Sequence, residues 1–283
     1  MAYLFVLLGA ILWGTTGTAQ SFIEGEAHPL TIGAFRLAIG GFSLLIFAAA
    51  AGKLKLNRTA GASVFLSAVS MALFQPLFFS SVQLTGIAVG TVVTIGSAPM
   101  LSGIIEWLFL KRRPDRVWVL ATALAIAGCI LLFAEGETLT IDPAGVLAGL
   151  GGGLAFATYA TVSKQALERM DTVSAVAVIF SLAALLLLPF LWVFDTGYAA
   201  EAGNLAVLLY LGIGATTLAY MLFSAGLRHI RSSAAVTLSL AEPLTAALLG
   251  VLLVGETLSA LAWTGVALLL AGIVALSAKR WIS

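Results

Sequence analysis

The sequence has little charge and almost no cysteine, and each shortage excludes a class of protein. Of its 283 residues, 10% are charged and 61% are hydrophobic, whereas soluble domains are about a quarter charged and about half apolar. The chain therefore belongs in a lipid bilayer. Its single cysteine, Cys129, excludes an internal disulfide framework. A net charge of +1 without a basic patch excludes a nucleic-acid partner.

The sequence also lacks the residue clusters that enzymes use. His28 and His229 are the only histidines and fall in different loops, so neither a metal site nor a catalytic triad can be built from them. The glycine-rich run at 149–153 has no strand before it and lacks the spacing of a phosphate-binding loop. We therefore expect no enzyme activity, no catalytic or metal-binding residue and no cofactor.

What is present is an internal repeat. Glu242-Pro243 interrupts a long apolar run, and Pro99 stands 144 residues before Pro243. The same shift aligns Phe79-Ser80 with Phe223-Ser224, and Gly128 with Gly272. Matches of uncommon residues at one common shift indicate that one unit is written twice, as is frequent in transporters.

Ten apolar stretches are each long enough, at about 20 residues, to cross a bilayer as a helix. They cover residues 2–22, 29–51, 60–82, 87–110, 116–134, 143–166, 172–194, 203–225, 232–254 and 259–279. The first stretch has no positively charged start and has a counterpart in mid-chain, so we interpret it as a span and not as a cleaved signal peptide. The predicted fold is an all-α polytopic membrane protein with ten transmembrane helices.

Positive charges gather in the loops on one side of these spans. The positive charges from Lys53 to Arg280 all fall on the side of the N-terminus, and only Arg36, within the second span, is left over. The positive-inside rule makes this side the cytoplasm, so both termini are expected there. We expect a multi-pass protein of the bacterial inner (plasma) membrane.

Five spans per unit is an odd number, so the second unit enters the membrane upside down relative to the first. The predicted architecture is two inverted five-helix repeats, at 1–134 and 143–280, joined by an extracytoplasmic loop at 135–142. A membrane anchor without transport does not account for duplication with inversion.

The duplication and several motifs resemble the drug/metabolite transporter (DMT) superfamily, in its ten-helix EamA branch. The motifs are Leu12-Trp13-Gly14, Phe79-Ser80 followed by Pro99, and the run from Pro243 through Gly255-Glu256 to Gly265 and Gly272. Within this branch the chain is similar to the YddG-type amino-acid exporters. The resemblance implies export, and a central cavity surrounded by the first, third, fourth, sixth, eighth and ninth helices. One departure is that the first repeat has Lys111-Arg112 where the second has Gly255-Glu256.

Glu242 is a charge at membrane depth. It lies about ten residues beyond Ser232, hence about 15 Å into the bilayer and near its midplane. Pro243 removes a backbone donor and frees the Ser239 carbonyl, and Pro99 does the same in the first repeat, so we predict helix breaks at both prolines. Paired breaks in transporters mark the binding site. Glu242 either contacts a substrate amine or couples protons, or it is a structural acid paired with Arg36 or a hydroxyl.

Two other charges lie within predicted spans. Arg36 is either a ligand for a substrate carboxylate or a structural partner of carbonyls or of an acid such as Glu242. Glu106 lies near Lys111, and we expect it to extend toward the cytoplasmic surface in a structural role.

Polar and aromatic residues at helical spacing indicate which faces look inward. The candidate substrate-binding residues of the central cavity are Trp13, Thr16, Gln75, Phe78, Ser97, Phe156, Tyr159, Tyr220, Ser239 and Glu242. The alternative for each is ordinary packing between helices. For the Gly145, Gly149 and Gly153 ridge, packing is the interpretation we adopt.

These features predict a secondary transporter that exports small amphipathic metabolites, above all neutral or aromatic amino acids, by alternating access. The aromatic residues would equally suit an exporter of lipophilic cations or drugs, and a non-transporting membrane subunit is the alternative of another class. The expected partners are a small-molecule substrate and the lipid bilayer. A monomer is compatible with the sequence, which leaves the oligomeric state open.

Overall fold

The computed structural model describes residues 1–134, 142–255 and 257–278, and in these ranges every regular element is a helix. The helices are α1 (Ala2–Gly14), α2 (Thr16–Gln20), α3 (Pro29–Ala50), η1 (Arg58–Ala60), α4 (Gly61–Leu110), α5 (Arg116–Leu132), α6 (Pro143–Arg169), α7 (Thr172–Leu187), α8 (Phe190–Val193), η2 (Gly197–Ala200), α9 (Ala202–Leu209), η3 (Tyr210–Leu218), α10 (Ala219–Leu227), α11 (Ser232–Leu238), α12 (Ala241–Leu249), η4 (Gly250–Val254) and α13 (Ala260–Ala278). Of the predicted connecting loop at 135–142, only Asp142 lies within the described residues.

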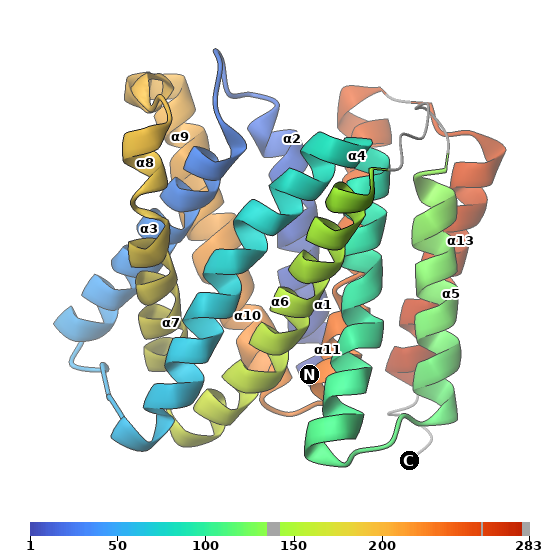
Figure 1. The fold of residues 1–283 in the computed structure, drawn as a ribbon, viewed down its shortest axis with the longest axis horizontal. Helices are drawn as coiled ribbons and strands as arrows, with labels where there is room; N and C mark the ends of the chain where they lie inside the picture. The colour runs from blue at the N-terminus through green and yellow to red at the C-terminus, as the bar shows by residue number, and fades with distance from the viewer. Residues whose placement is uncertain (135–141, 256, 279–283) are drawn as a thin grey trace.

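The all-helical membrane fold is confirmed. Within the described ranges, eight continuous helical segments are long and apolar enough to cross a membrane, and α5 is a shorter apolar helix. Figure 1 shows the long helices side by side in one bundle, with the N-terminus and the last turns of α13 toward its lower face. The protein is therefore a multi-pass membrane protein.

Local signals in the sequence fix where several helices begin. Asp115, Asp142 and Asp171 each precede a helix, and their carboxylates accept hydrogen bonds from the first free backbone N–H groups at 2.7–3.4 Å. Pro29 and Pro143 occupy first helical positions, where a missing N–H does no harm. These residues stabilise the polar ends of helices whose remaining length is apolar.

The predicted spans 60–82 and 87–110 form one element, α4, which reverses direction at Gly86. This residue has φ 83° and ψ 163°, a conformation open in practice only to glycine. Figure 1 shows one arm of α4 rising from the lower face and the other descending to it. The connection expected between these two spans is therefore a bend at a single residue, Gly86.

The two prolines behave differently. The helix breaks between α11 and α12, where the Glu242 N–H bonds the Ser239 carbonyl at 2.9 Å and the Ser239 hydroxyl bonds the Val236 carbonyl at 2.7 Å. α4, in contrast, continues through Pro99, where we expected a break. The repeat shift places Ile95 opposite Ser239, so α4 has no hydroxyl at the position from which Ser239 binds the Val236 carbonyl.

Small residues allow the closest helix contacts. A Cβ at Gly128 of α5 would lie 2.6 Å from the Gly265 carbonyl oxygen, and a Cβ at Gly265 of α13 would lie 2.6 Å from that of Gly128. A Cβ at Gly272 would lie 2.6 Å from the Ala121 carbonyl oxygen. Backbones packed this closely hold α5 and α13 together by dispersion contacts over many atoms.

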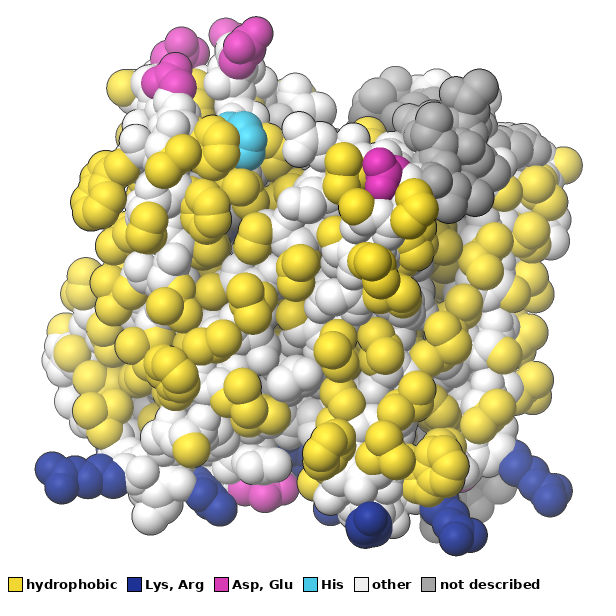
Figure 2. Space-filling view, in the orientation of Figure 1, with side chains coloured by type: hydrophobic (Ala, Val, Ile, Leu, Met, Phe, Trp, Pro, Cys, Tyr) yellow, Lys and Arg dark blue, Asp and Glu magenta, His cyan; other side chains and the backbone are white. Residues whose placement is uncertain are grey.

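Charges separate to the two ends of the bundle. Figure 2 shows Lys and Arg along the lower edge, most Asp and Glu along the upper edge, and a hydrophobic belt between them. The lower loops include Lys53–Arg58 and Lys111–Arg116, whereas Glu24, Glu26 and Glu201 belong to the upper ones. Five charged residues of the predicted pattern, Glu135, Glu137, Glu256, Lys279 and Arg280, lie outside the described residues.

Candidate functional site

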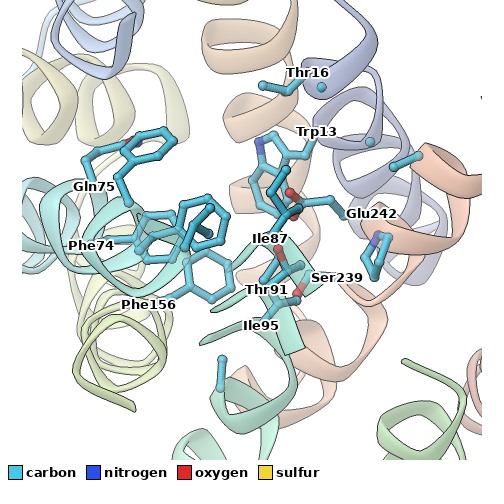
Figure 3. A pocket seen from close by; sticks show the side chains of 18 of the residues that line it. Trp13, Thr16, Phe74, Gln75, Ile87, Thr91, Ile95, Phe156, Ser239 and Glu242 are labelled. Atoms are coloured by element: carbon cyan, nitrogen blue, oxygen red, sulfur yellow. The ribbon is translucent and has the colours of Figure 1, made fainter. Parts of the chain in front are cut away.

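A cavity of about 410 Å³ opens inside the bundle between elements of both sequence halves. Figure 3 shows Trp13, Thr16 and Glu242 on one side of it and Phe74, Gln75 and Phe156 on the other. Its lining residues are Trp13, Gly14, Thr16, Gly17, Gln20, Arg36, Phe74, Gln75, Phe78, Phe79, Val82, Ile87, Thr91, Ile95, Ala98, Phe133, Phe156, Tyr220, Ser239, Glu242, Pro243 and Ala246.

Most of the residues chosen from sequence lie at this cavity. Its wall includes the predicted Trp13, Thr16, Gln75, Phe78, Phe156, Tyr220, Ser239 and Glu242, together with Arg36 and Pro243. Two helical faces account for much of this agreement, since Trp13 and Thr16 share one face and Gln75 and Phe78 another.

Three predicted residues do not line the cavity. Ser97 faces α6, because a Cβ at Gly153 would lie 2.2 Å from its hydroxyl oxygen. Tyr159 is 1% exposed and lies behind the wall, against Phe156, Phe180 and Tyr220. Pro99 is buried within α4. The Gly149–Gly153 ridge also packs against α4, as the spacing of its glycines predicts.

Sequence spacing missed several lining residues. Phe74 is one turn before Phe78 and stacks on it at 5.9 Å between ring centroids, so its position was available from the period of the helix. Phe133 follows the end of α5, and Val82 and Ile87 flank the reversal of α4. No pattern in the sequence marks these residues, since their position depends on how the ends of helices meet.

Aromatic rings form a continuous part of the wall. The Trp13 ring lies 4.6 Å from that of Tyr220 and 5.9 Å from that of Phe156, and Phe156 lies 5.6 Å from Phe74. Centroid distances of 4.5–7 Å are typical of favourable aromatic pairs. The rings therefore form a stiff apolar surface joining α1, α4, α6 and α10.

Glu242 is the acid at this wall. It is half-buried and follows the α11–α12 break directly. A Cβ at Gly14 would lie 2.7 Å from the Glu242 carbonyl oxygen, so α1 and α12 touch at this point. Within the described part of the chain its carboxylate has neither a hydrogen-bond partner nor an ion pair, so it is available to a ligand.

Arg36 reaches the same cavity from α3. Its Nε donates to the Thr216 hydroxyl at 3.5 Å. That hydroxyl donates in turn to the Leu211 carbonyl at 2.8 Å, inside the π-helical segment η3. The described residues contain no ion pair between Arg36 and Glu242, although both line the cavity. The guanidinium is therefore also free to meet a ligand.

The basic end of the bundle is closed by hydrogen bonds. Glu106 is 2% exposed, and its carboxylate accepts from the Ser233 hydroxyl at 2.7 Å and the Ser233 N–H at 3.3 Å. Arg231 donates to the Arg113 carbonyl at 3.1 Å. Glu106 does not extend to the surface as expected, because it is held by the free donors at the start of α11.

The cavity reaches toward the acidic end instead. Its lining includes residues at the ends of α2 and α5 and at the reversal of α4, all on that side of the bundle: Gln20, Phe133, Val82 and Ile87. The described residues contain no cluster of His, Cys, Asp and Glu suited to a metal. The arrangement can hold a small solute against apolar rings, with one acidic and one basic group at hand.

A multi-pass helical bundle around a ligand-sized central cavity is typical of membrane transport proteins. Within this class, the sequence pattern of the EamA-like transporter family matches residues 1–134 and 143–278. The chain belongs to the EamA-like transporter family, within the DMT superfamily, and is a transporter.

Similar proteins agree with this membership. The chain is 49% identical over 275 residues to the uncharacterized transporter YwfM of Bacillus subtilis, covering 97% of this chain and 93% of that protein. It is 29% identical over 255 residues to the threonine/homoserine exporter RhtA of Escherichia coli K12, covering 88% and 82%. A solved crystal structure matches 98% of each chain with a TM-score of 0.84 at 20% identity, and thus shares the fold.

Proposed function

We propose that this transporter exports small amphipathic metabolites, amino acids in particular, across the bacterial inner membrane. The observation that carries the proposal is that the Glu242 carboxylate, unpaired within the described residues, lies at a wall that includes a continuous aromatic surface. An ammonium group fits the carboxylate, and an apolar side chain fits the aromatic surface. The cavity volume, about 410 Å³, falls in the range of about 300–1,000 Å³ typical of small-molecule sites. RhtA, a similar protein, is named an exporter of threonine and homoserine.

The architecture that we propose for this function is ten crossings in two inverted repeats. The contacts between α5 and α13 support it, because the 144-residue shift turns Gly128 into Gly272 and Ala121 into Gly265. A Cβ at Gly128 would lie 2.6 Å from the Gly265 carbonyl oxygen, and a Cβ at Gly272 would lie the same distance from the carbonyl oxygen of Ala121, which is the shifted pair. An interface that maps onto itself when the halves are exchanged is expected of a two-fold axis in the membrane plane.

We propose that the basic end faces the cytoplasm and that both termini lie there. The positive-inside rule supports this orientation, as does the separation of charge in Figure 2. The cavity then reaches toward the outside, while the Glu106–Ser233 contact and a hydrogen bond from Lys164 to the Ile230 carbonyl close the cytoplasmic end. Export requires the opposite state, in which these contacts open.

We propose that one chain is sufficient for this mechanism, because the cavity lies inside a single bundle, between elements of both sequence halves. A monomer would therefore be active.

The test is transport by the purified chain in liposomes. Vesicles loaded with unlabelled leucine, threonine, methionine or phenylalanine should take up the labelled amino acid by exchange faster than protein-free vesicles. The control is the same vesicles with protein inactivated by heat. No protein-dependent exchange with any amino acid would contradict the proposal.

A second candidate is an exporter of lipophilic cations. Trp13, Tyr220 and Phe156 form an aromatic surface beside an acid, which suits cation–π binding. The same vesicles loaded with tetraphenylphosphonium discriminate the two candidates. Exchange of this cation without exchange of amino acids would favour the second.

A further inference from the structure

The basic group at the cavity has no counter-charge. Arg36 lies seven residues after Pro29, the first residue of α3, hence about 10 Å along this helix and within the membrane. Its Nε donates to the Thr216 hydroxyl at 3.5 Å, whereas its two Nη atoms have neither a hydrogen bond nor an ion pair within the described residues. Charges at membrane depth are costly and commonly mark the path of a solute. The free guanidinium therefore indicates a site for an anionic group.

The guanidinium is anchored on one side only. The Thr216 hydroxyl that accepts from Arg36 Nε donates in turn to the Leu211 carbonyl at 2.8 Å, inside the π-helical segment η3. π-Helical turns occur frequently at functional sites. An arginine held at Nε still presents its two Nη groups, which form a fork that binds a carboxylate through two parallel hydrogen bonds.

A second polar side chain lies close to Arg36 on the surface of α3. Gln75 of α4 packs against Gly33, because a Cβ at Gly33 would lie 3.0 Å from Gln75 Oε1 and 3.4 Å from its Cδ. Gly33 and Arg36 are three residues apart and thus share one face of the helix. The Gln75 amide has no hydrogen bond within the described residues. It therefore lies about one helical turn from Arg36 and can donate to the same ligand group.

The free polar atoms of these side chains are accessible from the cavity. In the described part of the chain, the unpartnered polar atoms that are fully buried belong to nine side chains, and Arg36, Gln75 and Glu242 are not among them. All three residues line the cavity. Figure 3 shows Gln75 and Glu242 on opposite sides of it. Donors suited to an anion thus lie across the cavity from an acceptor suited to a cation.

We propose that Arg36 and Gln75 form the subsite for the substrate carboxylate, and that this subsite selects amino acids over amines without a carboxylate. The inference rests on the proposed amino-acid transport and assigns the group of the substrate that Glu242 cannot bind. Arg36 binds the carboxylate through its Nη atoms, and the Gln75 amide donates a further hydrogen bond. An amine without a carboxylate gains neither contact and is repelled by the positive charge of Arg36.

The experiment compares leucine with 3-methylbutylamine, which is leucine without its carboxylate. Their affinities for the full-length purified chain are measured by calorimetry for wild type, Arg36→Gln, Arg36→Lys and Gln75→Met. Arg36→Gln should bind leucine about tenfold more weakly and Gln75→Met about fivefold more weakly, because the guanidinium supplies a charge and two hydrogen bonds and the amide only one bond. Both variants should bind the amine at least as tightly as wild type does.

The conservative variant separates the charge of Arg36 from its shape. Arg36→Lys keeps the positive charge but not the fork, so its affinity for leucine should lie between those of wild type and Arg36→Gln. An affinity for leucine as low as that of Arg36→Gln, with an equal loss for the amine, would assign Arg36 a structural role.

Matched controls make the same substitutions away from the cavity. Arg228→Gln changes an exposed arginine that follows α10, and Gln83→Met changes an exposed glutamine of α4. Neither residue lines the cavity. Both variants should keep the wild-type ratio of the two affinities.

The inference is overturned if wild type binds leucine while Arg36→Gln and Gln75→Met keep the wild-type ratio of affinities. An equal loss for leucine and 3-methylbutylamine in both variants overturns it too, because a change of shape would explain it. If Arg36→Gln does not fold, Gln75→Met alone decides between these results. Failure of the proposed function is a different result: wild type itself then binds no amino acid, and the inference falls with it.

Discussion

At the scale of single residues, the account depends on Glu242. Its carboxylate lines the cavity and is unpaired within the described chain, while the adjoining backbone is fixed by the bond from the Glu242 N–H to the Ser239 carbonyl. The side chain can therefore be changed without breaking a contact that holds the helices together.

Glu242→Gln should fold and reach the membrane as wild type does, and its amino-acid exchange should fall about tenfold or more, because the amide cannot neutralise an ammonium group. Its exchange should also vary less with pH, as an amide does not titrate. Vesicle exchange at several pH values measures both effects. Wild-type rates at every pH would make Glu242 a structural acid, and Glu168→Gln, an exposed acid of α6, is the control.

At the scale of elements, the closed basic end depends on how α11 begins. Glu106 of α4 holds the Ser233 N–H and hydroxyl, and Arg231 holds the Arg113 carbonyl. These bonds link the start of α11 to the last turns of α4 and to the α4–α5 connection.

Glu106→Gln should lower the thermal stability of the detergent-solubilised protein. The loss should correspond to about 0.6–1.7 kcal/mol, the range measured for hydrogen bonds between membrane helices, since the amide still accepts one bond but carries no charge. Thermal unfolding followed by intrinsic fluorescence measures the shift. An unchanged midpoint, equal to that of Glu168→Gln, would show that this contact does not stabilise the closed end.

The same elements show how far the sequence could predict the structure. Hydropathy and charge predicted the helices and the separation of charge, because both follow from burial in lipid. Proline alone did not predict the breaks: α11–α12 breaks at Ser239 and α4 continues through Pro99, although both prolines remove the same backbone donor. For the cavity, helical spacing identified Trp13, Thr16 and Gln75, but Tyr159 lies behind the wall because Phe156 and Tyr220 cover it.

At the scale of the whole molecule, the proposal fixes which end faces the cell interior. The loop with Glu24 and the loop with Lys53 flank α3 and lie at opposite ends of the bundle. Both belong to the exposed surface, and thus each can carry a reporter thiol.

Glu26→Cys should react with a membrane-impermeant maleimide in cells whose outer barrier has been permeabilised, whereas Lys53→Cys should react only after the inner membrane is lysed. The native thiol, Cys129, is buried and is replaced by alanine in both variants. Labelling in the reverse order would invert the orientation and with it the direction in which the cavity opens.

The central claim is that one cavity is the path of the substrate, and a single thiol tests it most directly. Thr91 lines the cavity on α4, and Thr91→Cys in the Cys129→Ala background places a reactive group there. We predict that a bulky impermeant thiol reagent, applied from outside, abolishes amino-acid exchange in vesicles, and that the transported amino acid slows this block. Full exchange after complete modification of the thiol would contradict the account.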